Sequence, residues 1–141
     1  MVETWPYRKL SKYPHMKPAD VLIWERFIEK YPDAYDTVQY DFWVGSPPPF
    51  NPIVNNETEG SADGLYRRKI DVVGHKDGNI TIIEIKPKAG LSAIGQVKGY
   101  TKLYVRDEVP NETTRSIIIT DQVSTDVQEV ARDEGVLIIV V

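Results

Sequence analysis

The sequence contains no cysteine, and its 141 residues include only two histidines and two methionines. Without cysteine the chain can form no disulfide, no thiolate metal site and no cysteine nucleophile. Long apolar runs are also absent, because the longest, Val136–Val141, falls far short of the 18 or so residues that span a bilayer. The N-terminus lacks the apolar stretch of a signal peptide. We therefore expect a cytoplasmic protein with no membrane partner.

Basic residues are fewer than acidic ones: the chain has 17 lysines and arginines and 21 acidic residues, for a net charge of -4. An acidic total argues against indiscriminate binding to polyanions. The charge is unevenly spread, however, and residues 67–102 contain eight basic and three acidic side chains. This block can present one positive face, and ordinary surface lysines explain it equally well.

Hydrophobic periodicity predicts an α/β (α+β) fold with a mixed central sheet flanked by helices. Residues 1–17, aromatic and basic, are expected to form an N-terminal arm, and residues 18–141 a single domain. Pro18 suits the first turn of a helix that ends at Pro32. We expect strands over 35–44, 67–74, 79–86, 115–120 and 136–141, and helices over 92–105 and from Thr125, where a capping box fits.

A short turn between the second and third predicted strands carries the most information. Asp77-Gly78 is a strong signal for a two-residue hairpin, and this register places Asp71 directly opposite Glu84. Lys86 lies two residues further along the strand and therefore on the same face as Glu84. Two carboxylates about 5 Å apart repel each other by roughly 3 kcal/mol at an effective dielectric near 20. Mg²⁺ or Mn²⁺, which prefer oxygen ligands, would relieve that repulsion.

Two simpler interpretations stay open. Asp71 can lie at the edge of the sheet while Glu84 and Lys86 form a solvated pair. A three-residue loop would instead place Asp71 opposite Ile83 and separate the two carboxylates, unless a bulge restored the register.

The next helix brings two polar side chains to the face that packs on the sheet. Gln96 and Tyr100 are four residues apart and share this face with Ala93 and Val97. They either complete the site or form the polar fringe of a packing surface.

These motifs, in this order, resemble those of the PD-(D/E)XK nuclease superfamily. Asp71 is followed after 12 residues by Glu84-Ile85-Lys86, and Gln96-x-x-x-Tyr100 is similar to an element of the RecB-like branch. The first helix and the terminal helix–strand unit also look like this restriction-endonuclease-like fold, αβββαβ with an extra C-terminal helix and strand. The resemblance implies a small phage-type or resolvase-like nuclease that hydrolyses DNA phosphodiester bonds.

The resemblance also implies roles for individual residues. Asp71 and Glu84 would bind Mg²⁺ or Mn²⁺ together with the backbone carbonyl of Ile85, and Lys86 would be the catalytic lysine. Some members add a carboxylate from the first helix. In this sequence Glu25 is a better candidate than Glu29, because it lies nearer the apolar side of that helix.

The remaining implied roles concern the substrate. Gln96 would position the substrate or the lysine, and Tyr100 would support it. Basic side chains would contact DNA phosphates without reading the sequence. The candidates are Arg67, Lys69, Lys88 and Lys98, with Arg8, Lys9 and Lys12 of the arm.

Two other functions compete with a nuclease. A catalytically inactive copy of the same fold could serve as a binding or structural part, for example in a phage virion. An α/β domain with an unrelated ligand is the third reading. Members of this size often act as dimers, so a homodimer is a further expectation.

Overall fold

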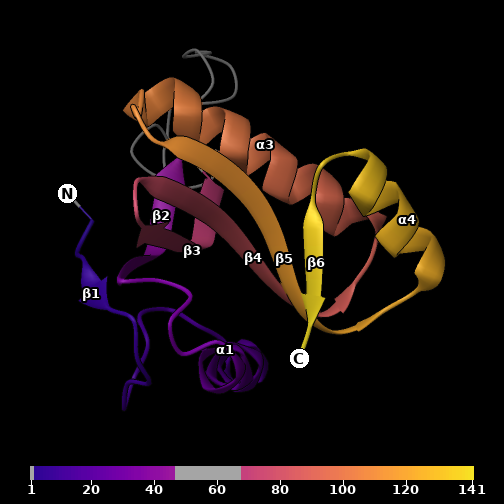
Figure 1. Ribbon diagram of the computed structural model, residues 1–141, viewed down its shortest axis with the longest axis horizontal. Coiled ribbons are helices and arrows are strands. Elements are labelled where there is room, and N and C mark those ends of the chain that lie inside the picture. Colours follow the sequence, from indigo (N-terminus) through magenta and orange to yellow (C-terminus); the bar gives the residue numbers. More distant parts are fainter. Residues whose placement is uncertain (1, 47–67) are drawn as a thin grey trace, which may run out of the picture.

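Alternating β-branched and aromatic residues form the central sheet of the computed structural model, which describes residues 2–46 and 68–141. The six strands lie side by side in the order of the sequence (Figure 1). The pairs β1–β2, β2–β3 and β3–β4 are antiparallel, whereas β4–β5 and β5–β6 are parallel, so the sheet is mixed. The strands are β1 (Trp5–Pro6), β2 (Thr37–Val44), β3 (Arg68–Lys76), β4 (Asn79–Ala89), β5 (Thr113–Val123) and β6 (Leu137–Val140).

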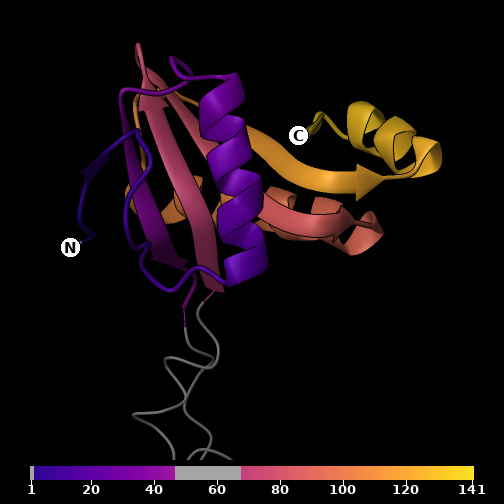
Figure 2. The same ribbon diagram turned by 90° about the horizontal axis from the view of Figure 1, so that it is seen from below.

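Within the described residues, three helices cover the two faces of this sheet. The helix α1 (Pro18–Lys30) lies across one face, whereas α3 (Leu91–Glu108) and α4 (Thr125–Asp133) lie on the other (Figures 1 and 2). None of the helices in the described ranges is long and apolar enough to cross a membrane. The predicted fold class, a mixed sheet flanked by helices with an additional C-terminal helix and strand, is confirmed.

Each face of the sheet has its own hydrophobic core. On the α1 side, Trp24 and Phe27 pack on Ile83 and Ile85 of β4. On the α3 side, the core includes Val97 together with residues of β2 to β5. Because both faces are covered, β4 contains a nearly continuous run of buried residues rather than an alternating pattern.

The N-terminal segment contributes to the α1-side core. Its two-residue strand β1 pairs with β2, and the side chains of Tyr7 and Tyr13 are buried. The ring of Tyr13 meets Tyr40 edge to face, with centroids 5.7 Å apart. The segment predicted as an arm therefore packs on the domain along part of its length.

The predicted hairpin register is present in the ladder between β3 and β4. Lys76 pairs with Asn79, and the pairing continues in step to Val72 and Ile83. Asp77 and Gly78 both have positive φ angles, 51° and 73°, as a type I′ turn requires.

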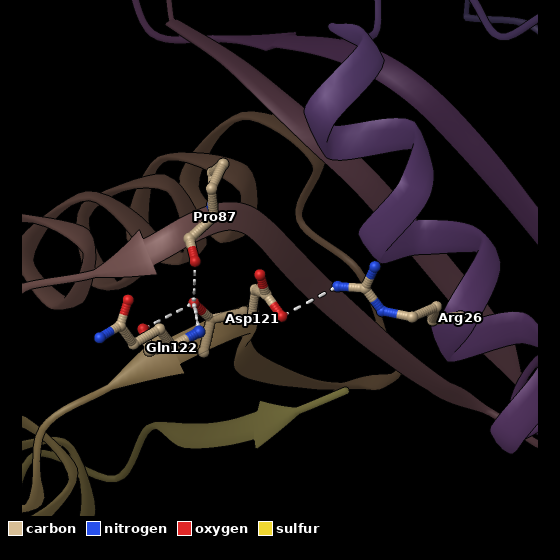
Figure 3. Close-up of polar contacts among 5 residues, drawn as sticks. Arg26, Pro87, Asp121 and Gln122 are labelled. Atoms are coloured by element: carbon tan, nitrogen blue, oxygen red, sulfur yellow. Dashed lines mark hydrogen bonds and ion pairs between the residues drawn. The ribbon is translucent and has the colours of Figure 1, made fainter.

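Strand β4 does not end at Pro87, as the sequence suggested, but continues to Ala89. The residues on either side of the proline, Lys86 and Lys88, pair with Thr120 and Gln122 of β5. The missing N–H of the proline is therefore not needed by the parallel ladder. Figure 3 shows the carbonyl of Pro87 accepting a hydrogen bond of 3.4 Å from the hydroxyl of Thr120.

Two C-terminal features also differ from expectation. Ser124, not Thr125, caps α4, because its Oγ accepts a hydrogen bond from the Val127 N–H at 3.2 Å. The last strand is apolar as predicted, but it lies at the edge of the sheet, so Leu137 and Val140 remain exposed.

Candidate active site

The candidate site lies where β3 and β4 separate. Their ladder ends at Val72 and Ile83, and the next residue on each strand is an acid, Asp71 or Glu84. We call this point the β3–β4 fork and the two residues the acid pair. Lys86 lies two residues beyond Glu84 on β4. The three charged residues of the predicted motif therefore belong to one short stretch of the sheet.

An irregularity in β2 accompanies the fork. Asp41 has a positive φ of 56°, and its pairing with Asp71 is interrupted between two regular stretches of ladder. The four alternating apolar residues of β2 are buried as predicted, but not in one core. Tyr40 packs in the α1-side core, whereas Phe42 packs in the α3-side core. The strand therefore changes face at Asp41, which the period-two pattern did not predict.

A hydrogen bond to the backbone holds Asp71 in the fork. Its Oδ2 accepts from the N–H of Ile85 at 2.8 Å, in the place where a carbonyl of β3 would otherwise pair. The N–H and C=O of one strand residue point to the same neighbouring strand. The carbonyl of Ile85 therefore lies on the side of the acid pair, where the predicted metal ligand is needed.

Glu84 is an acid in an apolar environment. Its side chain is only 4% exposed. Burial first, and then hydrogen bonding with Asp71 and the charge of Asp71, raise the pKa of Glu84 well above its usual range. The positive charge of half-buried Lys86 acts in the opposite direction. The structure thus brings Asp71, Glu84 and Lys86 together. The charge of Lys86 compensates only in part for the two neighbouring carboxylates.

An acid that the sequence analysis missed approaches from α1. Burial and then the charge of Asp71 raise the pKa of Asp20, and Lys17 and Lys86 oppose this shift. A cavity of about 90 Å³ is bordered by Asp20, Asp71 and Asp41. Nothing in the spacing of Asp20 distinguishes it from the acids that commonly stabilise the first turn of a helix.

Glu25, the predicted first-helix ligand, lies elsewhere. Its Oε2 accepts a hydrogen bond of 2.8 Å from the hydroxyl of Tyr13. The acids whose charges act on Glu84 are Asp71 and Asp20. The structure therefore does not bring Glu25 to the acid pair.

Tyr100 approaches the acid pair from α3, and Gln96 lies one turn earlier on the same helix. Burial and then the charge of Glu84 raise the pKa of the Tyr100 phenol, with a further contribution from Asp71 that Arg68 opposes. The Oε1 atom of Gln96 is buried and has no hydrogen-bond partner in the described part of the chain. Both residues line one groove on the surface of α3, and Tyr100 alone is linked to the acid pair by its electrostatics.

The predicted phosphate-binding residues differ in their availability. Lys98 is bound to Glu134, with its Nζ 3.0 Å from a carboxylate oxygen. Lys69 lies 3.6 Å from a carboxylate oxygen of Asp41 and over the ring of Trp43. Lys88 is exposed near the end of β4. Of the others, Lys9 pairs with Glu29, Arg8 and Lys12 are exposed, and Arg67 lies outside the described residues.

The donor set suits a hard divalent cation with few protein ligands. Within residues 2–46 and 68–141, no three Asp, Glu, His or Cys side chains converge closely enough to hold a metal ion. Mg²⁺ is usually held by one or two carboxylates, with water and substrate phosphates completing its shell. Two carboxylates and the Ile85 carbonyl fit this requirement, and a proton or a cation would relieve the repulsion between buried Glu84 and Asp71.

The mixed sheet is covered by helices on both faces (Figure 1), and the acid pair and Lys86 lie together on β3 and β4. The chain belongs to the Endonuclease NucS C-terminal domain family, which residues 65–140 match. The match includes the acid pair, Lys86 and all of α3. No curated protein matches the chain.

Solved structures share the fold at low sequence identity. A repair endonuclease from Pyrococcus abyssi has a TM-score of 0.51 and 20% identity, and the match covers 93% of this chain and 49% of that one. A complex of EndoMS with double-stranded DNA has a TM-score of 0.51 and 15% identity, with 95% and 49% covered. A crystallised protein of unknown function has a TM-score of 0.51 and 17% identity, with 85% and 54% covered. The chain spans about half the length of these proteins.

Proposed function

We propose that the domain is a metal-dependent DNA endonuclease of the PD-(D/E)XK type that hydrolyses phosphodiester bonds at the β3–β4 fork. The observation that carries this proposal is the acid pair, with Glu84 buried and Asp71 half-buried, followed by Lys86. Family membership supports a nuclease, and the EndoMS structure with double-stranded DNA supports DNA as the substrate.

The protein groups at the fork divide the chemical task. Asp71, Glu84 and the Ile85 carbonyl would hold Mg²⁺ or Mn²⁺. When bound, the cation lowers the pKa of a coordinated water and stabilises charge on the phosphate. Lys86 is close enough to act electrostatically on Glu84, so its ammonium can orient the attacking water or stabilise the charge that develops on the phosphate.

The residues on the two flanking helices would position the substrate. Tyr100 lies near the acid pair on α3, and the Oε1 of Gln96, which has no partner in the described chain, can accept a hydrogen bond from water or substrate. Asp20 adds negative charge from α1, next to Asp71. This charge strengthens the attraction for a cation.

Cation binding can be tested independently of activity. A cation that binds only the folded state raises the unfolding temperature, Tm, in a concentration-dependent way. We expect MnCl₂ to raise the Tm of the wild-type protein relative to EDTA. Asp71→Asn and Glu84→Gln should remove most of this increase, whereas Glu25→Gln should retain it. An equal increase in all four proteins would contradict a metal site at the acid pair.

Activity is tested with single-stranded, duplex and branched DNA in the presence of Mg²⁺ or Mn²⁺. Wild-type protein should cleave at least one substrate, and Lys86→Ala should reduce the rate at least 100-fold with an unchanged Tm. Lys102→Ala, which removes an exposed lysine from α3, is the matched control and should retain activity. Cation binding without cleavage of any substrate would instead support an inactive binding protein with this fold.

A further inference from the structure

A groove of about 590 Å³ runs along α3 beside the candidate active site. The helical residues that line it are spaced by three and four positions, so they form one straight stripe on the helix surface. With a rise of 1.5 Å per residue, the stripe from Ser92 to Tyr100 is about 12 Å long. The lining includes Arg68 of β3 and, from α3, Ser92, Gly95, Gln96, Gly99 and Tyr100.

Two glycines in this stripe have no steric function within the described chain. A Cβ atom added to Gly95 or Gly99 would meet no atom within 4 Å. Glycine in the interior of a helix costs about 1 kcal/mol relative to alanine. The helix therefore gives up stability at both positions without any benefit to its own packing, which is the expected situation where another molecule approaches the backbone closely.

The polar groups of the groove also lack partners. The buried Oε1 of Gln96 has no hydrogen bond in the described chain. Arg68 is exposed and forms no ion pair with a described residue. At the start of α3, Gly90 provides no side-chain cap and the first turn contains no acid, so the positive end of the helix is not neutralised.

Tyr100 lies both at the groove and near the acid pair. This residue lines the groove, and its phenol also interacts electrostatically with Glu84 and Asp71. Arg68 acts on the same phenol from the β3 side. A ligand that fills the groove would thus extend from the N-terminal end of α3 to the atoms that would perform the hydrolysis.

We propose that this α3 groove holds the sugar–phosphate backbone of one DNA strand, with Gly95 and Gly99 as the surface of closest approach. At 3.4 Å per nucleotide along a strand, about 12 Å corresponds to three or four nucleotides. An extended polyanion fits the exposed arginine, the uncapped helix end and the flat glycine surface better than a compact ligand does. The proposal rests on the proposed function, because it assigns a path to that substrate.

The decisive comparison uses alanine at both glycines, since this change separates stability from binding. Gly95→Ala/Gly99→Ala should raise the Tm, because alanine favours the helix and meets no neighbouring atom. Its affinity for a fluorescent DNA oligonucleotide, measured by anisotropy in EDTA to prevent cleavage, should fall at least tenfold. Val105→Ala, an exposed change on the opposite side of α3 that also favours the helix, should raise the Tm and leave affinity unchanged.

Each alternative result has a distinct meaning. If the double variant binds DNA within twofold of a wild-type protein that cleaves it, the groove proposal fails and the proposed function stands. A double variant with a lowered Tm contradicts the absence of a steric role for the glycines and also overturns the proposal. If wild-type protein neither binds nor cleaves DNA, the proposed function fails, and the α3 groove proposal fails with it.

Discussion

At the scale of single residues, Glu84 is an acid held in an unfavourable environment. A buried carboxylate beside a second carboxylate is unfavourable unless a proton or a cation compensates for it. Asp71 is held in this position by the Ile85 N–H, so the two acids cannot simply move apart. Strongly perturbed acids of this kind occur often at functional sites, which is why the acid pair rather than the larger groove defines the candidate active site.

His75 allows a test of the fold through pH. Burial lowers its pKa, although the charge of Glu112 opposes the shift, and one ring nitrogen lies 2.8 Å from Oε1 of Gln39. Since the folded state binds the proton less well than the unfolded state, stability is full above a pH of about 6.5 and decreases as the pH falls through the lowered value. Wild-type Tm should drop between pH 7.5 and pH 5 by about 1–3 °C more than that of His75→Gln. Thermal melts at both pH values check this, with exposed His15→Gln as the control.

The sequence could place the residues of the β3–β4 hairpin, but not those of α1. A two-residue turn and a period of two fix which residues of β3 and β4 face each other, so Asp71, Glu84 and Lys86 could be placed together. The rotation of α1 on the sheet depends instead on how Trp24 and Phe27 fit between strands. Glu25 and Asp20 are both near that face, and only the packing decides which approaches the acid pair.

At the scale of elements, the sequence predicts the type of each helix and strand better than its ends. Pro87 is a reliable strand terminator only where its N–H would be needed, and in β4 the neighbouring residues provide the pairing. Ser124 and Thr125 are chemically equivalent caps, so the choice between them depends on where the chain leaves β5. The change of face at Asp41 requires a left-handed residue that no periodicity reveals.

The contact between β3 and the segment before β2 is a tight one. A Cβ atom on Gly74 would lie 2.6 Å from Cδ1 of Tyr35, whose ring meets Tyr7 edge to face. We expect Gly74→Ala to lower the free energy of unfolding by about 1–3 kcal/mol through overpacking. Urea denaturation of the single variants and of Gly74→Ala/Tyr35→Ala provides a double-mutant cycle. The double variant should be less destabilised than the sum of the two single changes, and simple additivity would refute this contact.

At the scale of the whole molecule, the count of basic side chains overstates the positive charge that is available to a bound polyanion. Some basic residues of the 67–102 block are already paired with acids of the chain, namely Lys98 with Glu134 and Lys69 with Asp41. The positive charge left for phosphates is therefore smaller than the count over residues 67–102 indicates. The sequence could not show this, because the ion pairs join segments that are far apart along the chain.

The salt dependence of DNA binding distinguishes available from occupied lysines. Each phosphate contact contributes about -0.9 to the slope of log K against log salt concentration for duplex DNA. Lys88→Ala, which removes an exposed lysine from the end of β4 beyond the fork, should make the slope shallower by about one. Lys98→Ala should leave the slope unchanged, because its ammonium is bound to Glu134 and to a backbone carbonyl. Anisotropy titrations over a series of salt concentrations measure both slopes. If Lys98→Ala makes the slope shallower and Lys88→Ala leaves it unchanged, DNA crosses the α3–α4 side of the molecule instead of following β4 from the fork.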